Sequence, residues 1–300
     1  MLLLIIKNII SLGEYIMEKK KSLEKVGFGI AIMFGIYWIY TLFIQDRLNL
    51  APIFLTLIGF LTLYAAGLLL FTGVIKKIPN SELKKGRVSG KTLVICFLLQ
   101  FTALMITGML TNILALISGQ EITNDMEMLS PLMLFLLLIF NPIVEEFVFR
   151  KLFADKLLQY GELFYMLTSS FCFAIVHGVA IGIPQVVYTF LLGMIWSYLT
   201  VKTGSIKTSV ILHALSNLFG GIIIQLLQGI SMEAVGIYSI FMMLSSMTGI
   251  ILFLTSKKNI SIDGQSRLVD KGVLKDMFTN KGILFYAVLT IVMMTVKHLI

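Results

Sequence analysis

Apolar runs about twenty residues long recur along nearly the whole chain, and they constrain its fold more than any other feature. A helix needs about 20 apolar residues to cross a bilayer core. Because lipid offers no partner to an open strand edge, each such run is expected to be helical. The sequence therefore predicts an all-α fold, a polytopic transmembrane helix bundle of about 8–9 spans. The candidate spans are 27–45, 50–75, 92–118, 131–150, 163–182, 184–201, 208–230, 235–255 and, as the weakest candidate, 282–297.

The composition and charge also favour a membrane protein. Only 13% of the residues are charged and 58% are hydrophobic, whereas soluble chains are about 25% charged. The formal net charge of +8 would suit nucleic acid, but the positive charges flank the apolar runs, which is typical of membrane topology. We therefore predict a lipid bilayer as partner and no nucleic acid. Cys96 and Cys172 lie in apolar runs without metal-type spacing, so no disulfide framework or cysteine zinc site is expected.

Lysines and arginines gather in every second loop, beginning with the segment before the first span. Cytoplasmic loops carry this excess, so the alternation predicts a multi-pass protein with its N-terminus in the cytoplasm. Residues 1–16 begin apolar but are too short to span, which leaves an interfacial helix or a true start at Met17 as alternatives. The predicted organisation is a cytoplasmic or interfacial segment at 1–26, a transmembrane bundle at 27–255, a cytoplasmic connector at 256–281 and a possible last span at 282–300.

The fourth apolar run contains two adjacent carboxylates, Glu145 and Glu146, followed by Arg150. Ionisable groups inside a membrane helix are costly and are functional candidates by default. Glu146 and Arg150 are four residues apart and share a helix face, so they can pair. Glu145 points about 100° away from that face and has no local cation, which leaves it free to act as a general base. The alternative is that the span ends at Val144 and that these charges are interfacial.

Two of the three histidines also lie in predicted spans. His177 lies in the fifth run, where a lone histidine is more often a packing residue. His213 and Asn217 in the seventh run are four residues apart and face the same way. Two strong hydrogen-bonding groups on one face either converge on a polar site or hold helices together.

These residues form three ordered blocks, Glu145/Glu146/Arg150, Phe173/His177 and His213/Asn217. The pattern resembles the Glu-Glu-x-x-x-Arg, Phe-x-x-x-His and His-x-x-x-Asn motifs of the CPBP family of intramembrane proteases. That family includes the type II CAAX prenyl endopeptidases and bacterial relatives linked to bacteriocin immunity and peptide processing. The resemblance covers about residues 130–230. It implies a catalytic core there and, from the bacterial relatives, a bacterial cytoplasmic membrane.

The resemblance implies an endopeptidase that hydrolyses peptide bonds of membrane-associated peptides or proteins, with a hydrophobic or membrane-bound peptide as substrate. Glu145 would activate water, with His177 helping to position it. His213 and Asn217 would donate hydrogen bonds to the oxyanion. Glu146 and Arg150 would brace the site, or Arg150 would engage a substrate carboxylate. This mechanism needs no cofactor.

Zinc is the rival chemistry, because Glu145, His177 and His213 are suitable ligands in type. The predicted span limits also leave a geometric conflict. They place Glu145 and His213 within about two turns of the cytoplasmic side but His177 about 20 Å deep. The conflict requires a fifth span that begins later than Leu163, or helices that are tilted or staggered.

Two other functions compete with proteolysis. A non-catalytic member of the same fold would serve as a bacteriocin-immunity protein or scaffold. A membrane transporter would also bury polar groups in its helices, but it often contains internal repeats, and none is evident in this sequence.

Overall fold

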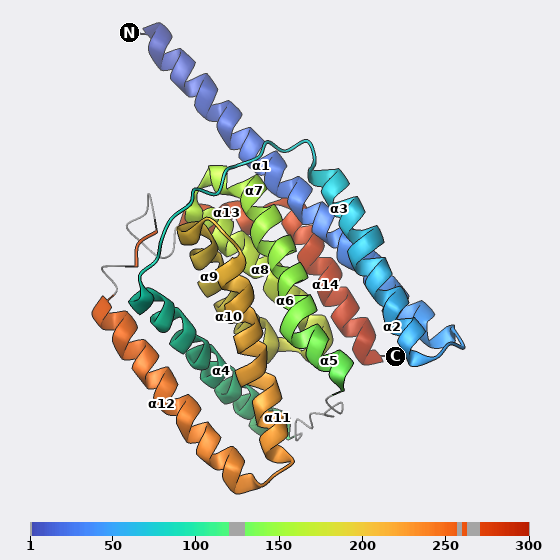
Figure 1. The fold of residues 1–300 in the computed structure, drawn as a ribbon. Helices are drawn as coiled ribbons and strands as arrows, with labels where there is room; N and C mark the ends of the chain where they lie inside the picture. The colour runs from blue at the N-terminus through green and yellow to red at the C-terminus, as the bar shows by residue number, and fades with distance from the viewer. Residues whose placement is uncertain (1, 120–129, 257–259, 263–270, 300) are drawn as a thin grey trace. The chain divides into compact units, whose positions relative to one another are not determined.

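A computed structural model describes residues 2–119, 130–256, 260–262 and 271–299. Every regular element in these ranges is a helix, as Figure 1 shows. Among the described residues, eight helices are long and apolar enough to cross a membrane, and a bent pair near the C-terminus raises the number to at most nine. The prediction of an all-α bundle with about 8–9 spans is confirmed. The chain divides into two compact units.

The first unit comprises Met1–Ser81, Asp155–Phe164 and Gln265–Ile300. Its longest helix, α1, packs against α3 and α14, which Figure 1 shows alongside it. The lysines at 19–21 lie inside α1, and Lys19 pairs with Asp276 at 2.6 Å between Nζ and Oδ2. Its helices are α1 (Leu2–Ile39), η1 (Tyr40–Ile44), η2 (Gln45–Arg47), α2 (Pro52–Phe60), η3 (Leu61–Gly67), α3 (Leu68–Ile75), η6 (Leu158–Tyr160), α13 (Lys271–Phe278) and α14 (Lys281–Leu299).

Helices α1 and α14 approach each other through two glycines. A Cβ added at Gly27 would collide with the backbone of Gly282, and one added at Gly282 would collide with the backbone of Glu24. Small residues let membrane helices pack backbone to backbone. The predicted last span is therefore tied to the first by close packing.

We expect Gly27→Leu to destabilise this helix pair by about 1–3 kcal/mol or more, because the new side chain has no room. Gly13→Leu on the same helix is the matched control, since nothing lies within 4 Å of its added Cβ. Thermal unfolding midpoints in detergent check the prediction. Equal midpoints for the two variants would contradict the packing.

The second unit comprises Glu82–Ala154 and Tyr165–Gly264. In Figure 1, α4 lies beside α12, and the contacts also pack α4 against α9 and α10 against α9, η4 and α6. This unit contains all the predicted site residues. The helices that form it, or enter it from the first unit, are α4 (Gly90–Ser118), α5 (Pro131–Phe135), η4 (Leu136–Phe140), α6 (Asn141–Glu146), η5 (Phe147–Leu152), α7 (Phe153–Leu157), α8 (Glu162–Ile181), α9 (Ile183–Thr203), α10 (Lys207–Asn217), η7 (Leu218–Ile222), α11 (Ile223–Gln228) and α12 (Met232–Ser256).

The second unit buries polar side chains among its apolar core residues, and its outer face is also apolar. Its exposed side chains include Leu116, Ile117 and Ile237, which suit a lipid surface. Hydroxyl residues are instead buried between α8 and α9. Small residues let these helices approach, and Gly193 on α9 faces the backbone of Ser170 on α8.

The fourth span is longer than the sequence predicted. It runs over Pro131–Tyr160 rather than ending at 150. Helix continues past Lys151 because Phe153, Ala154 and Leu157 are fully buried. The paired glutamates therefore lie near the middle of one continuous helical stretch rather than at its end.

This longer span also removes the conflict in depth. Glu145 lies fifteen residues before Tyr160, where the fourth span ends, and His177 lies fifteen residues after Glu162, where α8 begins. The two side chains are therefore at similar distances from the connection between these helices. No late start of the fifth span is needed.

Candidate active site

The local backbone around the paired glutamates departs from a regular α-helix. The short α6 lies between two π-helical segments, η4 and η5. Pro142 has no N–H to donate to the preceding turn, which is consistent with the irregular backbone before it. Such π segments occur often at functional sites. Glu145 and Glu146 lie in α6, between these two segments.

Glu146 and Arg150 form a completely buried ion pair. Both side chains are 0% exposed, and Arg150 Nε lies 3.2 Å from Glu146 Oε2. The guanidinium also lies over the rings of Phe173, at 4.2 Å, and Trp196, at 5.2 Å. The predicted pairing of these two residues is therefore present in the structure.

His213 joins both glutamates. Its Nδ1 lies 3.1 Å from Glu146 Oε1, and its Nε2 lies 3.8 Å from Glu145 Oε2. A carboxylate only accepts hydrogen bonds, so Nδ1 carries the proton in this contact. The second nitrogen of the ring is then directed at Glu145.

His177 faces the same carboxylate from α8. Its Nδ1 lies 2.7 Å from the carbonyl oxygen of Phe173, and its Nε2 lies 3.9 Å from Glu145 Oε2. A carbonyl also only accepts, so Nδ1–H donates here. In the neutral ring, Nε2 is consequently an acceptor. Two imidazoles thus converge on Glu145, each oriented by a hydrogen bond from its other nitrogen.

Glu145 is the more exposed of the two adjacent glutamates. Its side chain is 19% exposed, and its Oε2 has no hydrogen-bond partner among the described residues. The separations of 3.8 and 3.9 Å to the two imidazoles exceed hydrogen-bond length. The carboxylate therefore lies near both imidazole rings but forms a hydrogen bond with neither.

Asn217 lies one turn after His213 and contacts the fourth span at another level. Its Nδ2 donates to the carbonyl oxygen of Leu137 at 2.8 Å. Because His213 contacts Glu146 and Asn217 contacts Leu137, α10 runs antiparallel to the fourth-span helix. One of the two amide hydrogens of Asn217 forms this hydrogen bond, and the second is left over as a donor.

The structure adds three residues that sequence reasoning missed. Asn141 precedes Glu145 by one turn on the same face, and its buried Oδ1 has no hydrogen-bond partner in the described chain. Trp196 stacks on His213, with ring centroids 4.2 Å apart and planes inclined by 19°. Gln100 accepts the indole N–H at 3.2 Å. Asn141 adjoins the glutamates in the sequence, but nothing in the sequence connects Gln100 or Trp196 to them.

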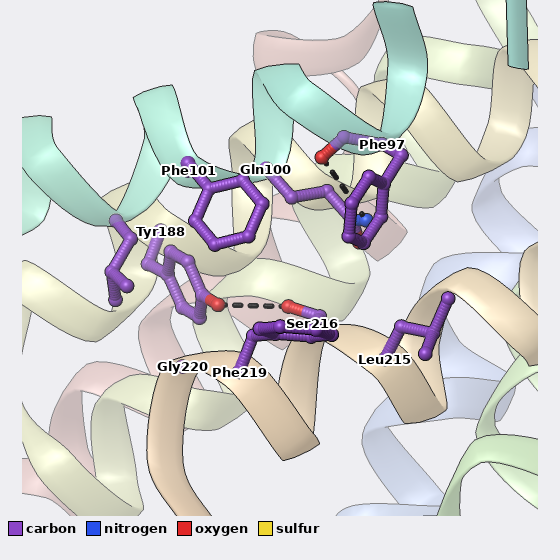
Figure 2. A pocket seen from close by; sticks show the side chains of 9 residues that line it. Phe97, Gln100, Phe101, Tyr188, Leu215, Ser216, Phe219 and Gly220 are labelled. Atoms are coloured by element: carbon purple, nitrogen blue, oxygen red, sulfur yellow. Dashed lines mark hydrogen bonds between the residues drawn. The ribbon is translucent and has the colours of Figure 1, made fainter. Parts of the chain in front are cut away.

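A small hollow lies next to this cluster, between α4, α9 and α10 (Figure 2). The volume of this hollow is about 10 Å³, enough for about one water molecule. Tyr188 and Ser216 share a hydrogen bond of 2.8 Å within it. Ser216 is therefore engaged in the hollow, in keeping with a site that needs no serine nucleophile. The lining residues are Phe97, Gln100, Phe101, Leu104, Tyr188, Leu215, Ser216, Phe219 and Gly220.

The described residues contain no formed ligand set for the alternative of a zinc site. Across the part of the chain that the structure describes, no group of three His, Cys, Asp or Glu side chains is arranged to hold a metal ion. Ligands at 2.0–2.1 Å from tetrahedral zinc stand about 3.3 Å apart, and Glu145 is 3.8 and 3.9 Å from the two imidazoles. We therefore derive no step through a metal from this arrangement.

Fold and site together define a polytopic helical membrane protein with a buried carboxylate–histidine centre. Residues 127–219 match the family described as "Type II CAAX prenyl endopeptidase Rce1-like". This segment contains the three motifs, so the match confirms the family resemblance that they suggested. The family implies CAAX-type intramembrane protease activity and a membrane-associated substrate. Comparison with curated proteins and with solved structures gave no match.

Proposed function

We propose that this protein is an intramembrane endopeptidase that hydrolyses peptide bonds by glutamate-activated water, without a cofactor. One observation carries the proposal: two imidazole Nε2 atoms lie 3.8 and 3.9 Å from the unpartnered oxygen of a single half-buried carboxylate, Glu145. A water molecule bound to this oxygen would have a neighbouring imidazole to orient it. General bases work within hydrogen-bond reach of the proton they remove.

In the proposed reaction, a water molecule donates one hydrogen bond to Glu145 and lies within reach of His177. Glu145 takes a proton from this water as its oxygen attacks the carbonyl carbon of the scissile bond. The C=O electron pair moves onto oxygen and creates a tetrahedral oxyanion. Collapse breaks the C–N bond, and the proton on Glu145 passes to the leaving nitrogen. The products are a carboxylate and an amine, and the carboxyl proton is released.

The oxyanion would be stabilised from α10. His213 donates Nδ1–H to Glu146, so its Nε2 donates only when the ring is doubly protonated. Glu146 supplies the balancing negative charge. Asn217 contributes the amide hydrogen that Leu137 does not use. Preorganised donors of this kind contribute about 10²–10³-fold to kcat each.

Glu146 and Arg150 serve as the brace in this proposal. Arg150 is wholly buried, paired with Glu146 and covered by Phe173 and Trp196. These contacts favour an internal role over direct binding of a substrate carboxylate. The brace positions His213, which shares Glu146 with the arginine.

The substrate class follows from the setting of the site. The centre lies within candidate spans, so we infer a hydrophobic or membrane-bound peptide. The multi-pass location is supported by the spans and the family. The alternation of basic loops supports our proposal of a cytoplasmic N-terminus. The bacterial relatives of the family that the motifs resemble support our proposal of a bacterial membrane.

We predict that Asn141→Ala lowers kcat about tenfold, or about 1.4 kcal/mol. Its free Oδ1 and Glu145 Oε2 are both acceptors on one helix face, and a water molecule has two hydrogens to donate. Asn112→Ala, on the exposed face of α4, is the control. Steady-state kinetics on one peptide check the prediction, and equal kcat values for the two variants would exclude a role in holding water.

The test of the function is cleavage of a panel of short quenched peptides by purified protein in lipid vesicles. Wild type is assayed with and without a strong chelator, and Glu145→Gln is run in parallel to reveal contaminating peptidases. Cleavage that survives the chelator supports the proposal. Cleavage abolished by chelator and restored by zinc would replace it with a metal mechanism. A folded wild type that cleaves neither these peptides nor prenylated peptides would favour a non-catalytic member.

A further inference from the structure

The indole of Trp196 forms the closest parallel contact to an imidazole in the site. Trp196 lies on α9, is almost completely buried, and stacks on His213 at 4.2 Å and 19°. Phe173 also reaches this ring, but at 6.0 Å and edge-on. Trp196 thus covers one face of His213, the side chain that faces both glutamates.

The other end of the indole is fixed from α4. Its single N–H donates to Gln100 Oε1 at 3.2 Å, and Gln100 Nε2 reaches back to the carbonyl oxygen of Phe97 at 3.5 Å. Figure 2 shows Gln100 at the wall of the hollow, with its amide directed at Phe97. Gln100 and Trp196 are both buried. Because buried Gln100 accepts the N–H of the buried indole, it favours the one orientation of the Trp196 ring in which this hydrogen bond forms.

Stacking supplies a restraint that the hydrogen bond of His213 lacks. The contact of Nδ1 with Glu146 fixes one point of the imidazole and leaves rotation about that contact. A parallel indole against the face of the ring opposes this rotation. Both restraints together hold Nε2 toward Glu145.

We propose that Trp196, held by Gln100, is a positioning residue that sets the plane of His213 in the active site. The kinetic part of this proposal rests on the proposed function, whereas the stacking part can be measured without catalysis. Misplacement by about 1 Å can cost about 100-fold in rate. The effect should appear in kcat and leave KM unchanged, because His213 acts in the transition state.

The kinetic test compares Trp196→Phe, Trp196→Leu and Gln100→Leu in vesicles, with rates normalised to folded protein. We expect Trp196→Leu to lower kcat about 10–100-fold with unchanged KM. Trp196→Phe keeps a flat aromatic ring against His213 and should retain most of the kcat that Trp196→Leu loses. Gln100→Leu should lower kcat about tenfold, whereas Gln228→Leu, at an exposed position, should not. Wild-type kcat in folded Trp196→Leu, or no rescue by phenylalanine, would overturn the proposal.

The second test needs no substrate. The chain contains two tryptophans, so Trp38→Phe leaves Trp196 as the single emitter. Contact with an imidazole quenches indole emission. We expect His213→Gln to raise the emission and Gln100→Leu to raise it part of the way. Unchanged emission in both variants would overturn the proposal even if the wild type cleaves peptides. If no peptide is cleaved, the emission of Trp196 in these two variants still tests whether the indole stacks on His213.

Discussion

Glu145→Gln is expected to lower kcat by about 10³-fold or more, equivalent to about 4 kcal/mol of transition-state stabilisation. Glutamine keeps the size and the hydrogen-bonding capacity of the side chain but cannot accept the proton from water. KM should change little, because the lost interaction belongs to the transition state. Pre-steady-state and steady-state cleavage of one quenched peptide measure both quantities.

The same substitution should leave the fold intact. Glu145 has no partner within hydrogen-bond distance at its Oε2, so its charge is not needed to satisfy a neighbour. Glu233→Gln, at an exposed position on α12, is the matched control and should retain wild-type rates. Full activity of Glu145→Gln in the presence of chelator would refute the proposed mechanism, because no other unpartnered carboxylate lies between the histidines among the described residues.

Arg150→Leu is expected to have the largest effect on stability, about 3–5 kcal/mol. Removing the guanidinium leaves Glu146 charged, wholly buried and without its arginine. The ring faces of Phe173 and Trp196 also lose the cation that they contact. Reversible unfolding in mixed micelles measures the free energy of unfolding.

A second variant separates the lost charge balance from lost packing. The double variant Glu146→Leu/Arg150→Leu removes both charges, so it should be more stable than Arg150→Leu alone. It should nevertheless be inactive, because His213 loses the acceptor that orients it. Arg87→Leu, at an exposed position, controls for the loss of an arginine. If the double variant proves less stable than Arg150→Leu, the destabilisation does not come from an uncompensated carboxylate.

Much of the candidate site could be read in the sequence because polar residues are rare in its apolar runs. Glu145, Glu146, His177 and His213 are conspicuous for that reason, and their ordered motifs led to the family that the match over 127–219 confirms. Gln100 and Trp196 are different, since each is individually unremarkable in a membrane helix. Their relation to His213 exists only through the packing of α4, α9 and α10.

The sequence by itself determined the helical class, the number of spans and the pairing of Glu146 with Arg150, because these depend on local hydropathy and helical periodicity. Tertiary structure alone decided how far the fourth helical stretch extends and which way the side chains of the site point. Hydropathy predicted that the fourth span ends near residue 150, yet it continues to Tyr160, with Phe153 and Leu157 buried in its last part. Two imidazoles then reach Glu145 from separate helices, and contacts between distant segments are set by packing rather than by local pattern.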